Sequence, residues 1–252
     1  FILIDYKGGG MAAAFEGLPH VAGIITNLGG NQTDRALASI HCEIKRRQAV
    51  FLRHQVKHID SYISLYREGH AQEPMPHLLI IADEFAELKK EQPEFVRQLI
   101  SASRVGRSLG VHLILATQKP DGVVDDEIWG NSRFRICLRV QSRQDSYGML
   151  RRYDAAYIVN PGRAYLQVGS DEIFEELQSG WSGARYDPEA NRAETLRGKL
   201  QMIGLQGQQL VISAKRPSDG EETGRVTQLA AVLAHICAVA RDNGISSAAP
   251  VW

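Results

Sequence analysis

The sequence predicts an α/β fold, with a mostly parallel sheet that carries helices on both faces and is followed by a helical linker. Short apolar segments alternate with longer amphipathic ones along most of the chain, which is typical of strands connected by helices. Residues 78–82 are apolar without interruption, as expected of a central parallel strand covered on both faces. Hydrophobic residues make up 44% and charged residues 23% of the chain, a composition that excludes wholesale disorder.

The strands are predicted from apolar runs and from the turn residues that stop them. Residues 1–6 form the first run and stop at a Lys-Gly-Gly-Gly turn at 7–10, and residues 21–26 form a second strand closed by glycines at 29 and 30. The remaining predicted strands are 78–82, 111–116, 134–140 and 164–168, with the last of these expected to end the core sheet.

Helices are predicted between these strands. A long helical stretch begins near Asn31 or Thr33, either of which can serve as its N-cap; Gly69, Pro74 and Pro76 end this region. A second helix is expected at about residues 93–107, and Asp145 is expected to cap a short helix. The apolar residues of the long helix recur at helical spacing and are Leu37, Ile40, Ile44 and Phe51.

The character of the chain changes near residue 189, so we expect a core domain at 1–188 and a helical connection and linker at 189–252. Glycines at 204 and 207 and the segment 217–220 indicate loops, and residues 226–241 form an alanine-rich amphipathic helix. The chain starts without methionine and inside a predicted strand. We interpret it as part of a longer protein, with the linker leading towards a following domain.

The charge balance disfavours a nucleic-acid partner. Lys+Arg and Asp+Glu number 29 each, so the chain has no overall field that would recruit nucleic acid or an anionic membrane. A local basic lining would suffice for a pore, which keeps a DNA partner open. Arg151, Arg152 and the basic triplet 45–47 are interpreted as solvated charge.

The cysteines and histidines indicate no metal site. Cys42, Cys137 and Cys237 are far apart and lack metal-ligand spacing, which is typical of reduced thiols in a cytosolic protein. The 8 histidines are scattered, and no pair has a ligand spacing on one face. No apolar run approaches the ~18 residues of a membrane span, and no signal-peptide pattern is present.

Residues 77–84 (HLLIIADE) carry a Walker B pattern, in which an apolar strand ends in two acids. A buried strand delivers a carboxylate to the carboxyl edge of the sheet, where nucleotides bind in doubly wound folds. Asp83 would then hold the shell of a Mg²⁺ ion through water, and Glu84 would polarise the attacking water. The alternative is a structural one, in which the acids only favour the first turn of the next helix.

Residues 111–120 (VHLILATQKP) supply a second strand that ends in polar residues. RecA-like ATPases carry a γ-phosphate sensor at the end of the strand beside Walker B, and Thr117 or Gln118 suits that role. An arginine just before this strand, Arg107 or Arg104, could reach a neighbouring subunit's nucleotide and neutralise charge in the transition state. The two motifs in this order favour an ATPase over the structural alternative.

These segments resemble the FtsK/SpoIIIE family of RecA-like P-loop NTPases. The resemblance is carried by residues 83–88, 104–112 and 116–120. Residues 5–9, residues 178–184 (QSGWSGA) and the segment from 227 to 252 are similar to the EccC/EssC ATPases of type VII secretion. DNA-pumping relatives carry an Asp-Ser-Arg triplet where this chain has an Asp-Ser-Tyr triplet ending at Tyr147, which favours the secretion branch.

The resemblance implies ATP and Mg²⁺ as cofactors and a ring or tandem array of ATPase domains. Asp83 and Thr117 would contact the nucleotide and its metal, Glu84 and Gln118 would act in hydrolysis, and Arg107, preferred over Arg104, would serve the neighbouring domain. It also implies a membrane secretion complex, a position on the cytoplasmic side of the cell membrane, and helical cargo proteins of the WXG100 type, exported as folded pairs. DNA is not expected as a partner.

One family element is missing from the sequence, which contains no Gly-x-x-x-x-Gly-Lys-Ser/Thr motif. At residues 7–10 the lysine precedes the glycines, so it cannot reach back to the phosphates as a Walker A lysine does. We expect the Walker A segment upstream of Phe1, and we expect the chain alone to be inactive. Two alternatives stay open: a DNA translocase of the same family, and a degenerate ATPase-fold docking module.

Overall fold

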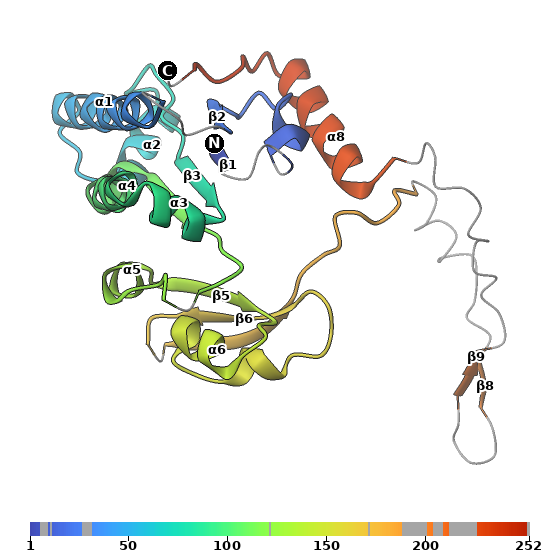
Figure 1. Cartoon of the computed structure of the whole chain (residues 1–252). Helices are drawn as coiled ribbons and strands as arrows, with labels where there is room; N and C mark the ends of the chain where they lie inside the picture. The colour runs from blue at the N-terminus through green and yellow to red at the C-terminus, as the bar shows by residue number, and fades with distance from the viewer. Residues whose placement is uncertain are drawn as a thin grey trace. The chain divides into compact units, whose positions relative to one another are not determined.

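The computed structural model describes residues 1–5, 10, 12–26, 32–120, 122–170, 172–187, 201–203, 209–211 and 226–250 (Figure 1). Two compact units are present, one of Phe1–Gly180 with Cys237–Trp252 and the other of Trp181–Ile236. The predicted domain boundary at residue 188 lies outside the described residues and stays a prediction. The predicted turns at 7–9 and 27–30, the candidate N-cap Asn31, the loops at 204, 207 and 217–220, and the last two residues of the tail also lie outside them.

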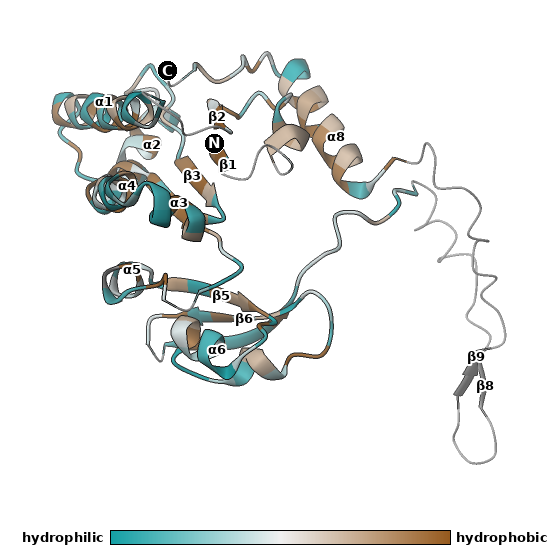
Figure 2. Cartoon of the chain, in the orientation of Figure 1, coloured by the Kyte–Doolittle hydropathy of each residue, from teal (hydrophilic) through white to brown (hydrophobic). Residues whose placement is uncertain are grey.

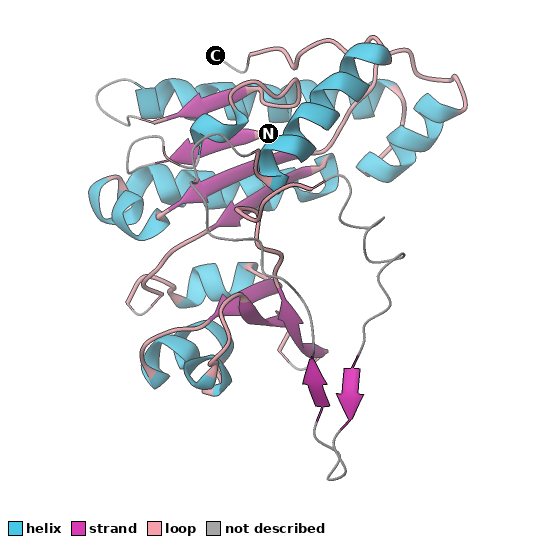
Figure 3. Ribbon diagram, turned by 90° about the vertical axis from the view of Figure 1, so that its right-hand side faces the viewer, coloured by secondary structure: helices cyan, strands magenta, loops and turns pink. Residues whose placement is uncertain are grey.

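The first unit contains a four-stranded sheet in the order β2-β1-β3-β4, and every neighbouring pair of strands is parallel. Figure 3 shows these strands side by side with helices beside them. The four strands predicted first along the chain are therefore confirmed. Their bounds are Ile2–Asp5 for β1, Gly23–Ile25 for β2, Leu78–Asp83 for β3 and Val111–Leu115 for β4.

The strands of the parallel sheet are mostly apolar and pack one face of the sheet into the core. Ile2, Ile4, Ile80 and Ala82 are each at most 1% exposed, and the central strands are coloured as hydrophobic in Figure 2. The alternate residues Leu79 and Ile81 are partly buried, so neither face of this part of β3 is fully exposed and the run at 78–82 shows no polar alternation.

Four helices and two 3-10 helices connect these strands, and α1, α2 and α4 lie on one side of the sheet (Figure 1). The apolar stripe predicted for the long helix is buried in the core. Thr33 lies inside this helix and is buried, so it is not the N-cap that the sequence suggested. The bounds are Gln32–Arg53 for α1, Ile59–Arg67 for α2, Phe85–Glu91 for α3, Pro93–Gly106 for α4, Ala12–Phe15 for η1 and Arg107–Leu109 for η2.

The interpretation of the basic triplet 45–47 as solvated charge is wrong for Arg47, which is only 3% exposed. Its guanidinium donates to the carbonyl oxygens of Leu109 and Pro76, each at 2.8 Å, and to Glu43 Oε1 at 2.7 Å. Because these partners satisfy the buried charge, an arginine is accommodated on the apolar face of α1. It ties α1 to the two segments that lead into β3 and β4.

A second sheet in the first unit is antiparallel, in the order β5-β6-β7. The strands predicted at 134–140 and 164–168 are present, but residues 163–168 are not the last strand. The chain turns back at Gly169, which has φ +64°, and β7 follows. Its residues, IFEELQ, are largely exposed and partly charged, so no apolar run marked it as a strand. The bounds are Phe134–Leu138 for β5, Arg163–Val168 for β6 and Ile173–Gln178 for β7.

Short helices pack around the antiparallel sheet: α5 (Asp126–Asn131), α6 (Arg143–Leu150) and η3 (Asp154–Tyr157). The N-cap of α6 is Ser142, whose Oγ accepts a hydrogen bond from the Asp145 amide at 3.0 Å. Asp145, which the sequence suggested as the cap, instead accepts a bond from the Ser142 hydroxyl at 2.6 Å. The Ser142 hydroxyl therefore caps the helix while its own proton is bound by Asp145.

The second unit holds the start of α8 (Gln228–Asp242) and the strands β8 (Gln201–Ile203) and β9 (Gln209–Val211). The predicted alanine-rich helix is confirmed. Its first amides are satisfied from the segment 178–184, because the carbonyls of Ser182 and Ala184 accept bonds from Leu229 and Gln228. Thr227 Oγ1 accepts a further bond from the Ala230 amide. The segment 178–184, which resembles the secretion ATPases, thus contributes two carbonyls that accept bonds from the N-terminus of α8.

Candidate functional site

Two acidic residues end neighbouring strands at the carboxyl edge of the parallel sheet. Asp5 is the last residue of β1, Asp83 is the last residue of β3, and the two are register partners. Asp5 is buried, at 4% exposure, whereas Asp83 is partly exposed. The carboxyl ends of parallel strands are where ligands bind in open α/β sheets, so the structure brings negative charge to the place that the Walker B pattern predicted.

Glu84 follows directly and adopts a strained backbone conformation. Its φ and ψ are 49° and 44°, in the left-handed region, which residues with a Cβ rarely adopt. Its amide donates to Asp83 Oδ1 at 2.9 Å, and the residue is 6% exposed. Such strain persists where the surrounding structure fixes the residue, and it is frequent at functional sites. The turn holds both carboxylates at the point where β3 becomes α3.

The end of β4 is hydrogen-bonded to the turn between β3 and α3. The amide of Ala116 donates to the carbonyl of Ala82, and the carbonyl of Ala116 accepts from the amide of Phe85, both at 2.9 Å. These bonds extend the pairing of β3 with β4 beyond the strands themselves. Thr117 is therefore the first residue past the sheet beside the acidic turn.

The predicted sensor residues differ in how firmly they are held. Thr117 Oγ1 accepts a bond from the Lys119 amide at 3.2 Å and donates to the Lys119 carbonyl at 3.4 Å. Gln118 is exposed. The loop that follows is anchored to α3, since Lys89 Nζ donates to the Val123 carbonyl at 2.7 Å and to Asp125 Oδ2 at 2.6 Å. Thr117 thus has a fixed side chain and Gln118 an adaptable one.

The acidic edge fits a magnesium ion held with the help of a nucleotide. Carboxylate oxygens are the ligands that Mg²⁺ prefers, and it commonly takes one or two of them together with waters and phosphate oxygens. Asp83 is accessible and keeps carboxylate lone pairs beyond its bond to the Glu84 amide. Within the described part of the chain, no group of three His, Cys, Asp or Glu side chains could hold a metal ion by itself. The site therefore fits an ion coordinated by protein and nucleotide together better than one coordinated by protein side chains alone.

The two candidate arginines lie at the other edge of the sheet. Arg107 begins η2, which leads into the start of β4, and Arg104 lies in the last turn of α4. Both are exposed. Five strand residues of β4 separate this end from Thr117, a distance of about 16 Å at ~3.3 Å per residue. The structure brings Asp83, Glu84 and Thr117 together but does not bring either arginine to them.

Asp5 is the residue of this edge that sequence reasoning left out of the site. Its signal was present, because it is an acid at the end of an apolar strand, as Asp83 is. The strand order, in which β1 is the neighbour of β3, could not be predicted from the sequence.

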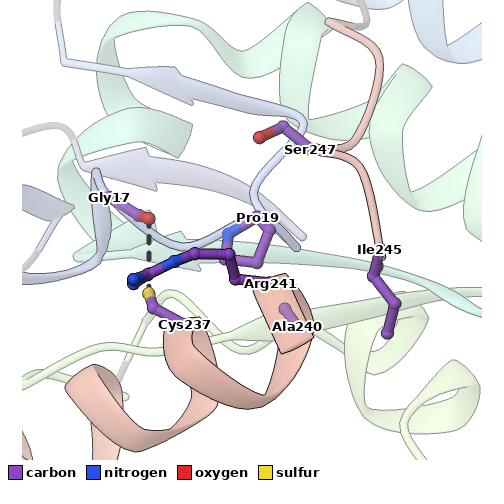
Figure 4. Close-up of a pocket in the computed structure, with 7 residues that line it drawn as sticks. All are labelled: Gly17, Pro19, Cys237, Ala240, Arg241, Ile245 and Ser247. Atoms are coloured by element: carbon purple, nitrogen blue, oxygen red, sulfur yellow. Dashed lines mark hydrogen bonds between the residues drawn. The ribbon is translucent and has the colours of Figure 1, made fainter. Parts of the chain in front are cut away.

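A shallow pocket of about 280 Å³ lies elsewhere in the first unit, between the last turns of α8 and the segment after η1 (Figure 4). The amide of Ala248 donates to the Pro19 carbonyl at 2.7 Å, and Cys237 Sγ contacts the Gly17 carbonyl oxygen at 3.5 Å. None of the predicted site residues lines it. Its lining residues are Gly17, Pro19, Cys237, Ala240, Arg241, Ile245 and Ser247.

The cysteines are free thiols, as predicted. Burial, together with the charge of Asp145, raises the pKa of Cys137 to about 11, so this thiol stays protonated at neutral pH. Cys42 is exposed on α1. Among the described residues, no helix is long and apolar enough to cross a membrane.

Comparison with known proteins decides the family. Residues 1–122 match the FtsK/SpoIIIE family, and the whole chain is 52% identical over 254 residues to the type VII secretion system protein EssC of Staphylococcus aureus. The chain belongs to the FtsK/SpoIIIE family of ATPases. Its relatives within that family are the EssC and EccC proteins of type VII secretion, as the resemblance predicted. It spans only 17% of the length of EssC.

Solved structures support the assignment of this chain to the FtsK/SpoIIIE family. The cytoplasmic domain of the type VII secretion ATPase EccC from Thermomonospora curvata superposes with a TM-score of 0.71 at 28% identity, over 100% of this chain and 25% of that one. ATPases 2 and 3 of the same EccC, solved in complex with a signal sequence peptide, match with a TM-score of 0.58 at 21% identity, over 71% of this chain and 31% of that one. The predicted P-loop NTPase fold is confirmed by these similarities.

Proposed function

We propose that the chain is part of an ATP-hydrolysing motor domain of a type VII secretion ATPase that drives the export of helical proteins of the WXG100 type. The main support for the proposal is the hydrogen bonding between β3 and β4 that continues past their ends. It brings Asp83 and Glu84 next to Thr117. Similarity to EssC along the whole chain supports the secretion role.

The chemistry assigned to each residue follows from its position. Asp83 would hold the water shell of Mg²⁺, which neutralises charge on the phosphates when it is bound. Glu84 would orient and polarise the attacking water, since its carboxylate follows directly after Asp83 at the carboxyl edge of the sheet. Gln118 would donate a hydrogen bond to the γ-phosphate, or Thr117 would do so by turning its hydroxyl away from the Lys119 carbonyl. Arg107, on the far edge of this chain, would serve the nucleotide of a neighbouring domain.

A phosphate-binding loop has to come from outside these residues, because the sequence has no Walker A motif. The open side of β4 is a suitable place for the strand that carries it. Among the described residues, β4 pairs only with β3, and Ile114 is 44% exposed. A strand added there would end beside Thr117 and would bring backbone amides to the phosphates.

The test is ATP hydrolysis by a longer form of the protein that includes a Walker A segment. Glu84→Gln should retain ATP binding and lower the rate by at least a hundredfold, because the carboxylate acts in the chemical step. Glu87→Gln, three residues further along α3, is the matched control and should hydrolyse ATP at the normal rate. Undiminished turnover by Glu84→Gln would remove Glu84 from the mechanism.

The proposed cargo is a helical segment of a secreted protein. An EccC relative binds a signal sequence peptide, and the balanced charge of the chain does not favour a duplex partner. We infer that the motor acts on the cytoplasmic side of the cell membrane, within a membrane secretion complex. The cytoplasmic region should therefore bind a C-terminal peptide of a WXG100-type protein. Tight, salt-sensitive binding of duplex DNA that stimulates hydrolysis, with no response to the peptide, would instead identify a DNA translocase.

A further inference from the structure

Two histidines that are 35 residues apart in the sequence meet at the amino edge of the parallel sheet. His77 directly precedes β3, and His112 is the second residue of β4. The Nδ1 atom of His77 lies 2.9 Å from the Nε2 atom of His112, and the ring centroids are 5.1 Å apart. The two rings therefore meet through their nitrogen atoms, and both side chains are exposed to solvent.

The backbone fixes this meeting. The amide of Leu78 donates to the Gly110 carbonyl at 2.8 Å, and Leu79 is the register partner of His112. Gly110 has φ +76°, and a Cβ atom built there would lie 3.2 Å from His77 Nδ1. Only glycine leaves this space open, so the approach of the two rings depends on the turn into β4.

We propose that His77 and His112 form a two-histidine site for a divalent transition-metal cation such as Zn²⁺. Neutral imidazole nitrogens are ligands that Zn²⁺, Ni²⁺ and Cu²⁺ favour. Two nitrogens that bind one tetrahedral Zn²⁺ at about 2.0–2.1 Å lie about 3.3 Å apart. The observed 2.9 Å is within a few tenths of an ångström of that separation, so a small rotation of each exposed ring would aim both lone pairs at one ion. The cation would replace the direct contact between the two nitrogens.

The site is separate from the acidic edge. β3 spans six residues between His77 and Glu84, so about 20 Å of strand lies between the two ends at ~3.3 Å per residue. The ligand chemistry also differs, because Mg²⁺ takes oxygen ligands and the histidine pair offers only nitrogen. Excess Mg²⁺ should therefore leave the histidine site unaffected.

The surroundings indicate a site of moderate affinity. In the described ranges, no third His, Cys, Asp or Glu joins the pair as a ligand, so water would fill the remaining positions. The negative charge of Asp60 favours a positive charge at His112, whereas the positive charge of Arg47 disfavours one. Glu43 is bonded to Arg47 at 2.7 Å and offsets that charge. A bound ion would join the starts of β3 and β4.

The experiment is a calorimetric titration of the untagged chain with ZnCl₂ in the presence of excess Mg²⁺. One ion per chain should bind, and His77→Gln and His112→Gln should each weaken binding at least tenfold. His41→Gln is the matched control, because His41 is exposed on α1 beside the exposed Cys42. It should bind Zn²⁺ as the unchanged chain does. Equal affinity in all of these proteins, or no binding below millimolar Zn²⁺, would overturn the proposal.

A second measurement does not depend on any variant. Imidazole ¹⁵N resonances report directly on which ring nitrogens bind a metal. On addition of Zn²⁺ to the unchanged chain, the Nδ1 resonance of His77 and the Nε2 resonance of His112 should shift together. Shifts confined to other histidines would refute the site even if calorimetry detected binding.

Discussion

Asp5 and Asp83 stand opposite each other at the carboxyl ends of two neighbouring parallel strands. Such strands lie about 4.8 Å apart, and register partners point to the same face of the sheet. Asp5 is only 4% exposed, so this residue is buried at the carboxyl edge of the sheet. Two acids at this spacing make the edge attractive to a cation.

Asp5→Asn should raise the Mg²⁺ concentration needed for half-maximal ATP hydrolysis by about tenfold, which corresponds to ~1.4 kcal/mol. The physical reason is the loss of one of two negative charges that attract the ion. The measurement is a Mg²⁺ titration of hydrolysis by the longer protein that includes a Walker A segment. Asp34→Asn, in the first turn of α1, is the control and should leave the titration unchanged. If Asp5→Asn also leaves it unchanged, Asp5 has only a structural role.

Arg47→Met should lower the free energy of unfolding by about 3–5 kcal/mol, the usual cost of breaking a buried ion pair. The substitution leaves the buried carbonyl of Leu109 without the bond that Arg47 donates and removes one of the arginine partners of Glu43. Urea unfolding of the whole chain measures the change. Arg46→Met is the matched control, because Arg46 bonds the same Glu43 from a side chain that is 47% exposed. It should cost at most about 1 kcal/mol, and equal losses in the two variants would contradict this account of Arg47.

Some of the site could be predicted from the sequence because its signal is local. Asp83, Glu84 and Thr117 lie at or just after the ends of apolar runs, and such a run with polar residues at its end can be recognised without tertiary information. The partnership of Asp5 with Asp83 could not be predicted, since it depends on strand order. The meeting of His77 and His112 depends on the same strand pairing.

The errors in the predicted fold have tertiary causes. Arg47 sits in a basic triplet that is typical of a solvated surface, and its carbonyl partners lie 29 and 62 residues further along the chain. β7 was missed because its exposed, charged residues stabilise an antiparallel edge without an apolar pattern. Apolar runs and helical spacing did predict the parallel strands and α8.

In the absence of added metal, the folded chain should lose stability as the pH falls below about 6.5, the usual histidine pKa. Burial, the charge of His77 and the charge of Arg47 lower the pKa of His112, while Asp60 opposes them. A lowered pKa in the folded state favours the neutral ring, so its contribution is present above the unfolded value and is lost on acidification.

Thermal unfolding from pH 5 to pH 8 in the presence of a chelator measures this dependence. His112→Gln should flatten the curve over the acidic half of that range, whereas His41→Gln should not. A curve for His112→Gln that falls as steeply as that of the unchanged chain would show that other groups cause the acid sensitivity.

Arg107 should act on the nucleotide of a neighbouring domain. It precedes β4, whereas Asp83 and Thr117 lie at the carboxyl ends of β3 and β4, so the strand length separates it from the acids of its own chain. Removing an arginine finger typically costs on the order of a thousandfold in rate, and Arg107→Ala should lose that much in the assembled longer protein. Arg97→Ala, an exposed arginine of α4 paired with Glu94, serves as the control and should stay active.

Mixing inactive subunits distinguishes action between domains from action within one. An Arg107→Ala subunit keeps its own Glu84, and a Glu84→Gln subunit keeps its own Arg107. If the arginine reaches across an interface, a mixed assembly contains some sites in which the intact Glu84 of one subunit meets the intact Arg107 of its neighbour, and part of the activity returns. If the arginine acts within its own chain, every site in the mixture lacks one of the two groups. An assembly shown to contain both variants and to remain inactive would therefore place the finger in the same chain, whereas Arg107→Ala subunits that stay active by themselves would point to Arg104.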